Sequence, residues 1–370
     1  MSVETLTEKE PSETSVQLLA VGDIMPGAAY FSPLVDENST LNTIMEEPKQ
    51  IVEENVLQSF EGGDVVFGNL ECVISDDIMN NDLGVPKRMV APPETLDFIE
   101  ECGFDILNLN NNHILDYGSS LVAATQNQLE SHNINHIGNP LRKEIPITIT
   151  TKGLDIHFIG YNLCEEGNTA DESEIFKTLD ELSSVAGMVV VSVHWGWGYE
   201  HTLKPAPSQI NLGHKLIDGG ADIVLGHHSH TFQPVEKYND GVIAYSLGNF
   251  LFDMWRDENI ESGILGIKIA VENEPKEGKI EGVNVIPISQ KNGMIDKTTS
   301  SRISNSVIYG SPQNNSEKEY RIYAEKIKQK HRCDVVQQYI RNFHKFPLEF
   351  HLSTLSQWFA KISTNKLGDE

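Results

Sequence analysis

Short apolar runs that end in polar residues or glycine recur along the chain. They span residues 16–21, 64–67, 104–109, 189–193, 221–225 and 242–247, and longer runs follow at 263–271 and 280–288. Runs of this length, closed by turn residues, are typical of buried strands. Segments with a helical spacing of apolar residues lie between them, at 48–60, 92–102, 119–132 and 212–218. This alternation predicts an α/β fold whose helices cover both faces of a sheet.

Polar side chains follow the predicted strands at their carboxyl ends. They are Asp23, Glu71, Asn112, His113, His194, His228, His230 and Asn249. In open α/β sheets the ligand site lies beyond the carboxyl ends of the strands. We therefore expect these side chains to converge on one site.

The most concentrated of these signals is the histidine cluster at 226–230. Strand side chains alternate between faces, which predicts that His228 and His230 share a face and that His227 points away from it. Imidazole is the commonest side-chain ligand of transition metals, so the pair predicts part of a metal site. The alternative is a polar loop with incidental histidines.

Composition narrows the class of protein. Of the 370 residues 39% are hydrophobic and 22% are charged, which is typical of a globular protein with a buried core. The net charge of −26 argues against binding to nucleic acid or to an anionic membrane surface, because like charges repel. Residues 1–15 lack the apolar core of a signal peptide, and no run of about 18 apolar residues follows, so we expect a cytoplasmic protein.

Changes in composition predict four segments. They are a disordered tail at 1–15, a main domain at 16–290, a linker rich in Ser, Thr, Asn and Gly at 291–315, and a helical C-terminal extension at 316–370. Ser316 and Glu319 form a predicted capping box at the start of that extension. The extension is rich in Lys and Arg, which indicates either a solvated helix face or a lid that contacts an anion.

Six motifs occur in a fixed order along the main domain. They are Gly22-Asp23-Ile24-Met25, Gly68-Asn69-Leu70-Glu71, Asn111-Asn112-His113 with Asp116, Val193-His194-Trp195-Gly196, Gly226 to His230, and Ser246-Leu247-Gly248-Asn249-Phe250. Together they resemble the CapA family of poly-gamma-glutamate capsule biosynthesis proteins. That resemblance covers roughly the main domain and implies a layered α/β sandwich of the calcineurin-like metallophosphatase type.

The resemblance also implies a set of metal ligands. Asp23, Glu71 and His230 are expected to hold one divalent ion, and Glu71, Asn112, His194 and His228 a second, with Mn, Fe or Zn as the candidates. Two such ions clamp an anionic substrate and activate a water molecule. His113 is then the expected proton donor to the leaving group, oriented by Asp116. Arg88, Arg256 and Asn249 are candidate substrate contacts.

Two departures from the wider metallophosphatase pattern weaken the expected site. Met25 stands where phosphatases carry a histidine ligand, and a thioether binds hard divalent ions poorly. Asn69 stands where a bridging aspartate is usual, so a bridge depends on Glu71. These changes leave open a site with two metal ions, with one, or with none.

Three functional hypotheses follow from the resemblance. The first is a metal-dependent hydrolase that acts on a phosphate ester, or on an anionic polymer or peptide related to poly-gamma-glutamate. The second is a metal-independent peptide epimerase that uses the same side chains to remove and return an alpha proton. The third is a non-catalytic scaffold for capsule biosynthesis. Fold alone does not choose among them.

Overall fold

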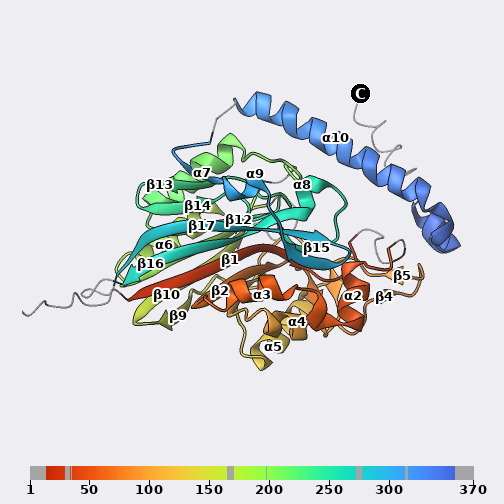
Figure 1. The fold of residues 1–370 in the computed structure, drawn as a ribbon, viewed down its shortest axis with the longest axis horizontal. Coiled ribbons are helices and arrows are strands. Elements are labelled where there is room, and N and C mark those ends of the chain that lie inside the picture. The colour runs from red at the N-terminus through yellow and green to blue at the C-terminus, as the bar shows by residue number, and fades with distance from the viewer. Residues whose placement is uncertain are drawn as a thin grey trace, which may run out of the picture.

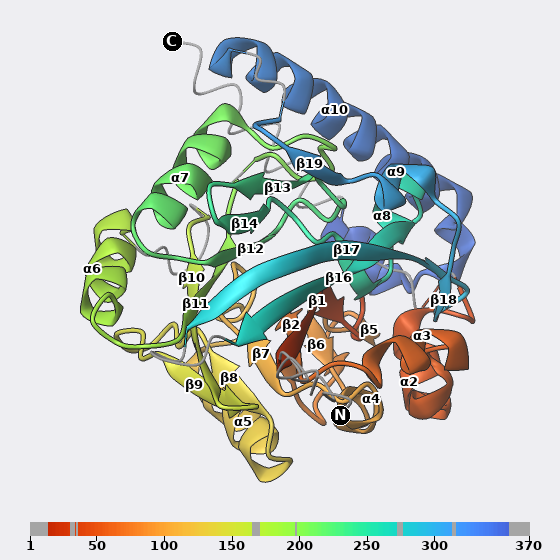
Figure 2. The ribbon, with the colours of Figure 1, turned by 60° about the vertical axis from the view of Figure 1, so that its left-hand side comes forward.

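Two β-sheets packed face to face, with helices on both outer sides, form the body of the protein. The computed structural model describes residues 14–29, 34, 36–164, 171–196, 198–271, 277–312 and 316–354. Figure 1 shows the layers from one side, and in Figure 2 the helices α2 to α5 and the helices α6 and α7 lie on opposite sides of the sheets. The predicted layered α/β sandwich is therefore confirmed.

The first sheet has eight strands and carries the N-terminal half of the candidate site. Its order is β18 (Met294–Lys297), β17 (Gly278–Lys291), β16 (Glu261–Val271), β1 (Ser15–Met25), β2 (Val65–Leu70), β7 (Ile106–Asn108) and β8 (Asn135–Ile137), with β15 (Asn249–Phe252) beside β1. Asp23 in β1 is in register with Asn69 of β2 on one side and with Asn249 of β15 on the other. The parallel strands β1, β2 and β7 thus end at the same edge.

The second sheet has seven strands. Its order is β19 (Val307–Tyr309), β13 (Val235–Tyr238), β14 (Gly241–Ala244), β12 (Ile223–His227), β11 (Met188–His194), β10 (Leu154–Asn162) and β9 (Ile147–Thr151). Strands β10, β11, β12 and β14 are parallel, and His194 of β11 is in register with His227 of β12. The predicted strands therefore divide between two sheets.

Helices cover the outer face of each sheet. Those on the first sheet are α2 (Thr40–Glu46), α3 (Glu54–Phe60), α4 (Thr95–Glu101) and α5 (Ser119–Ser131), and those on the second are α6 (Glu172–Leu182) and α7 (Pro207–Asp218). The remaining elements are the short strands β3 (Val73–Ile74), β4 (Met79–Asn80), β5 (Val85–Pro86) and β6 (Val90–Ala91), the helices α8 (Asp257–Ile260), α9 (Ser301–Ser304) and α10 (Glu317–Arg341), and the 3-10 turns at Pro48–Gln50 and Phe343–Lys345.

Three apolar layers hold the sandwich together. The layer between the sheets includes Leu18, Phe67 and Phe158, and the rings of Phe67 and Phe158 stack with their centroids 6.2 Å apart. Alternate side chains of β1, such as Leu19 and Val21, point instead into the layer beneath the helices. Central strands buried on both faces are apolar throughout, and this is why they are recognisable as continuous runs.

The segment predicted as a linker differs from that prediction. Within 291–312 the chain forms β18, which pairs with β17, then α9, and then β19, which pairs with β13. These are short peripheral elements with partly exposed polar side chains, so their composition resembles that of a loop. The predicted capping box is confirmed, because Ser316 Oγ accepts from Glu319 N and Glu319 Oε2 accepts from Ser316 N.

Several predictions concern the two ends of the chain. Residues 1–13, most of the predicted disordered tail, and residues 355–370 of the predicted extension lie outside the described residues. None of the helices that the structure describes combines the length and the apolar character needed to span a bilayer.

Candidate metal centre and substrate pocket

The predicted site residues come together where the two sheets meet. Asp23 lies near the end of β1, Glu71 follows β2, and Asn112 and His113 follow β7. From the second sheet, His194 ends β11, and His228 and His230 follow β12. The carboxyl ends of strands from both sheets thus supply one buried polar cluster.

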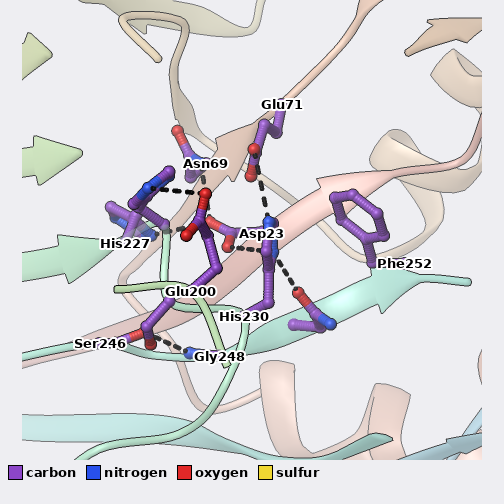
Figure 3. A network of polar contacts seen from close by, with 12 residues as sticks. Asp23, Asn69, Glu71, Glu200, His227, His230, Ser246, Gly248 and Phe252 are labelled. Atoms are coloured by element: carbon purple, nitrogen blue, oxygen red, sulfur yellow. Dashed lines mark hydrogen bonds and ion pairs between the residues drawn. The ribbon is translucent and has the colours of Figure 1, made fainter. Parts of the chain in front are cut away.

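Asp23 is the most firmly held member of this cluster. Its Oδ1 accepts from Asn69 Nδ2 at 2.8 Å, and Asn69 Oδ1 in turn accepts from Asn108 Nδ2 at 2.8 Å. In Figure 3 Asp23 lies between two imidazoles, with His227 Nδ1 3.3 Å from Oδ1 and His230 Nδ1 3.2 Å from Oδ2. Burial acts to raise the pKa of Asp23, but the contacts with the two histidines hold it well below the ordinary value. Asp23 is therefore an ionised carboxylate.

Glu71 has the opposite environment. Its side chain is fully buried, and neither carboxylate oxygen has a hydrogen-bond partner among the described residues. Glu71 Oε1 lies 3.8 Å from Nε2 of His194, 3.8 Å from Nε2 of His230 and 4.0 Å from Nε2 of His113. These distances are too long for hydrogen bonds. Burial, and next the charge of Asp23, raise the pKa of Glu71 well above its usual value.

The spacing around Glu71 fits a divalent cation. Two ligand atoms that each lie about 2.1 Å from a tetrahedral ion are about 3.4 Å apart, and wider angles increase that separation. One oxygen or nitrogen from each of Asp23, Glu71 and His230 lies within 4.8 Å of the others, and all three residues are buried. A buried carboxylate without donors is costly, and a cation supplies the missing partner. The residues present therefore fit a metal ion.

A second group of potential ligands lies beside the first. Atoms of Cys164, His194 and His228 also lie within 4.8 Å of one another, with His228 Nδ1 3.1 Å from His194 Nε2. Burial lowers the pKa of His228 to about 4 and that of His194 well below its usual value. Both rings are thus neutral, which is the form that binds metals. Cys164 was not predicted as a ligand although it closely follows β10, because a single cysteine is equally typical of a small buried apolar residue.

His113 lies at the outer edge of the cluster. Its Nδ1 donates to Asp116 Oδ2 at 2.8 Å, and its Nε2 accepts from Asn112 Nδ2 at 3.2 Å. The side chain is 26% exposed, so His113 reaches both solvent and the buried carboxylate of Glu71. Asn112 Oδ1 is buried without a hydrogen-bond partner among the described residues, as a metal-binding oxygen would be.

A pocket of about 250 Å³ opens over this cluster. It is lined by Arg88, Asn112, His113, Glu200, His201, His228, His230, Lys328, His331 and Arg332. Of the three predicted substrate contacts, Arg88 lies in this lining. Arg256 does not, because it is buried with Nε 3.5 Å from Glu258 Oε2. Asn249 accepts from His230 Nδ1 at 3.0 Å, so it orients that imidazole from behind.

The prediction for the histidine cluster is correct only in part, because His228 and His230 line the pocket and His227 does not, yet His227 does not point away from Asp23. Strand β12 ends at His227, and the backbone φ angles of His228 and His230 are 90° and 55°, so strand alternation does not continue through the cluster. His227 consequently contacts Asp23. Three pocket residues were also missed, namely Glu200, His201 and His331, whereas Lys328 and Arg332 belong to the basic extension for which a lid was one alternative. None of the three follows a strand, so the strand-end signal could not identify them.

Comparison with known proteins places this cluster in a recognised family. Residues 17–254 match the bacterial capsule synthesis protein family PGA_cap. The chain is 27% identical over 319 residues to the capsule biosynthesis protein CapA of Bacillus anthracis, covering 81% of this chain and 73% of that protein. It is 30% identical over 267 residues to the PGA biosynthesis protein CapA of Bacillus subtilis strain 168, covering 68% and 67%. A novel phosphatase from Mycoplasma pneumoniae is a remote structural neighbour, with a TM-score of 0.43 and 15% identity over 75% of this chain and 95% of that one, too distant to assign an activity.

Proposed function

The chain belongs to the bacterial capsule synthesis protein family PGA_cap, and from this premise we propose that it is a metal-dependent hydrolase. Its substrate is an anionic polymer or peptide related to poly-gamma-glutamate, or a phosphate ester. The observation that supports this most directly is Glu71, a fully buried carboxylate that has no hydrogen-bond partner among the residues the structure describes and three imidazoles at 3.8–4.0 Å. Such an arrangement is costly without a cation.

The proposed ligands form two groups that share Glu71. Asp23, Glu71 and His230 would hold one ion, and Glu71, Asn112, His194 and His228 would hold a second. When bound, divalent ions supply Lewis acidity and lower the pKa of a bound water. Asn69, which replaces the usual bridging aspartate, donates to Asp23 and fixes the direction of that carboxylate. Asn249 Oδ1 accepts from His230 Nδ1 and fixes the orientation of that imidazole.

The remaining steps belong to side chains that line the pocket. Arg88 binds an anionic group of the substrate, and its guanidinium can form paired hydrogen bonds with a carboxylate or phosphate. His113 gives a proton to the leaving group, and Asp116 Oδ2 accepts from His113 Nδ1 and fixes the orientation of the ring. The buried walls of the cluster limit the access of other water molecules.

Elemental analysis of protein purified without chelators tests this proposal. We expect about one to two equivalents of Mn, Fe or Zn per chain, and we expect the double variant His228→Ala/His230→Ala to lose them. The loaded protein should then hydrolyse members of a panel of phosphoesters and gamma-glutamyl peptides. A protein that contains no metal, and that gains no activity when Mn, Fe or Zn is added, would contradict the proposal.

One observation favours the epimerase as a second candidate. The raised pKa of Glu71, caused first by burial, favours the protonated form that can donate a proton, and His113, whose Nε2 lies 4.0 Å from Glu71 Oε1, lines the pocket. An epimerase needs two such groups. Uptake of deuterium at the alpha carbon of a glutamyl peptide by metal-free protein would favour this candidate over the hydrolase.

His113→Gln is expected to lower kcat by about 10²-fold or more, because the leaving group loses its proton donor. The loss should be small for p-nitrophenyl substrates, whose leaving group departs without a proton. Metal content should not change. Asp116→Asn is the matched control, and its effect should be smaller because the imidazole is kept and only its orientation is weakened. Equal losses for good and poor leaving groups would exclude the proposed role of His113.

A further inference from the structure

Helix α10 crosses the mouth of the pocket, and we infer that its middle part binds a second anionic group of the substrate through Lys328 and Arg332. The inference rests on the proposed function, in which a first anionic group of the substrate is bound beside Glu71. In Figure 1 α10 lies along one side of the sandwich, outside both sheets. It also begins after residue 254, where the family match ends.

The N-terminal part of α10 is fixed to the loop that carries two pocket residues. Tyr320 Oη donates to the carbonyl of Lys204 at 2.6 Å, and Tyr323 Oη accepts from Leu203 N at 3.1 Å. Tyr199 Oη donates to Glu317 Oε1 at 2.9 Å. Because Glu200 and His201 lie between these anchoring points in the sequence, α10 and this wall of the pocket form one unit.

The C-terminal part of α10 is fixed separately. Tyr339 packs against Phe346, with ring centroids 5.3 Å apart, and its hydroxyl lies 2.6 Å from His351 Nδ1. Val335 and Phe350 pack against the same cluster. Leu34 of the main domain packs against this cluster, and Val335 and Tyr339 line a cavity together with Val85 and Arg88. The helix therefore meets the main domain on both sides of the pocket.

The buried stripe of α10 changes character where it passes the pocket. Tyr320 and Ala324 come before this point, and Tyr339 comes after it, each buried and at the spacing of three or four residues that keeps one face. Between them the stripe carries Lys328 and His331. Packing alone favours apolar residues at such positions, so these polar side chains point to a ligand.

His331 connects this part of the helix to the metal cluster. Its ring stacks on His201 with centroids 4.0 Å apart, and the ring of His201 lies 6.0 Å from that of His230. Trp255 stacks near His331 with centroids 5.8 Å apart. This series of rings sets the position of α10 relative to the proposed ligand His230. Lys328 and Arg332, within one turn of His331, are therefore positioned over the same opening.

The charge around the pocket is unlike that of the whole chain. The net charge is −26, yet Arg88, Lys328 and Arg332 line the pocket and Glu200 is its one carboxylate among the described lining residues. No ion pair within 4.0 Å joins Lys328 or Arg332 to a carboxylate in the part of the chain that the structure describes. Their positive charges are thus available to a ligand, and they attract anions although the protein as a whole is negatively charged.

These features indicate the chemical class of the ligand. A single phosphate beside Glu71 leaves Lys328 and Arg332 unused, whereas a chain with repeated carboxylates can occupy both places. Guanidinium and ammonium groups bind carboxylates through charge-assisted hydrogen bonds. The ligand inferred here is therefore an extended polycarboxylate, with α10 selecting for the charge of the residues next to the reacting one.

The experiment measures binding of a fluorescein-labelled, gamma-linked hexaglutamate by fluorescence anisotropy. Lys328→Gln/Arg332→Gln is compared with Lys318→Gln/Lys326→Gln, which removes the same charge from exposed positions of α10 outside the pocket lining. We expect Kd to rise about tenfold or more for the first pair, as for the loss of charged hydrogen bonds, and less than about twofold for the second. Thermal denaturation of both variants verifies that they are folded.

The outcomes separate this inference from the proposed function. Weaker binding by the pocket variant alone supports the inference, whether or not hydrolysis is detected. Metal content and turnover of the wild-type protein test the proposed function independently. Equal binding by the two variants, or no binding of the hexaglutamate by the wild-type protein, overturns the inference even where hydrolysis of a phosphoester is found.

Discussion

Replacing Glu71 with Gln is expected to remove bound metal and to reduce hydrolytic activity by about 10²-fold or more. Removing a residue that only supports a metal ligand already lowers activity, and removing the ligand itself should lower activity further. Glu71 is the carboxylate shared by the two proposed ligand groups. The amide keeps the shape of the side chain but lacks the negative charge that two neighbouring cations require. Elemental analysis and the hydrolysis assay measure the two effects.

The same substitution has an expected effect on stability. Burial without a hydrogen-bond donor among the described residues raises the pKa of Glu71, so above the ordinary pKa of a glutamate this side chain destabilises the metal-free protein, whether it stays charged or takes up a proton. In excess chelator we therefore expect Glu71→Gln to unfold at the same temperature as the wild-type protein or above it. In the presence of metal the order should reverse, because only the wild type gains the free energy of metal binding.

Glu200→Gln is the matched control for Glu71→Gln. Glu200 also lines the pocket and its Oε1 lies 3.9 Å from His228 Nε2, but it belongs to neither buried group of ligands. Its variant should keep the metal. Wild-type metal content in Glu71→Gln, or equal loss of metal in both variants, would show that Glu71 is not the shared ligand.

Gly22→Ala is expected to have the largest effect on the fold. A Cβ at Gly22 would lie 2.0 Å from the carbonyl oxygen of Gly248 and 2.7 Å from that of Leu247. Both are backbone atoms, and the same carbonyl of Gly248 accepts from Asp23 N at 2.9 Å. The strands β1 and β15 must therefore separate. We expect a loss of about 3 kcal/mol in the free energy of unfolding, measured by urea denaturation.

This substitution should also impair the site, because β1 carries Asp23 and β15 carries Asn249. Gly62→Ala is the control, since a Cβ at Gly62 meets no atom within 4 Å. Its effect should lie within about 0.5 kcal/mol. A Gly22→Ala protein as stable as the Gly62→Ala protein would contradict the close approach of the two strands.

Much of the fold was predictable because burial restricts which types of residue a segment contains. Strands such as β2 and β11 are buried on both faces and are therefore apolar along their length. The polar ends of the strands predicted that Asp23, Glu71 and His194 converge, and they do, although His194 comes from the second sheet and not from the edge that Asp23 and Glu71 share. The capping box of α10 was predictable for a similar reason, because its two hydrogen bonds involve residues three apart.

Other features were not predictable because they depend on contacts between distant segments. An apolar run is the same whether its strand joins one sheet or another, so the division into two sheets had no signal. The edge strands β18 and β19 are partly exposed and resemble a loop in composition. The orientation of His227 depends on where β12 ends, which the backbone angles of His228 and His230 decide.

The ends of the strands, the polar residues that follow them and the family of the protein could be predicted without a structure, because each depends on local periodicity or on ordered motifs. The folded chain was needed to show that Asn69 supports Asp23 while Glu71 has no hydrogen-bond partner in the described part of the chain. It alone also placed α10 over the pocket. No local sequence pattern predicts which cavity a helix covers. The position of the helix depends on contacts between side chains more than 100 residues apart in the sequence, such as Tyr320 and Thr202.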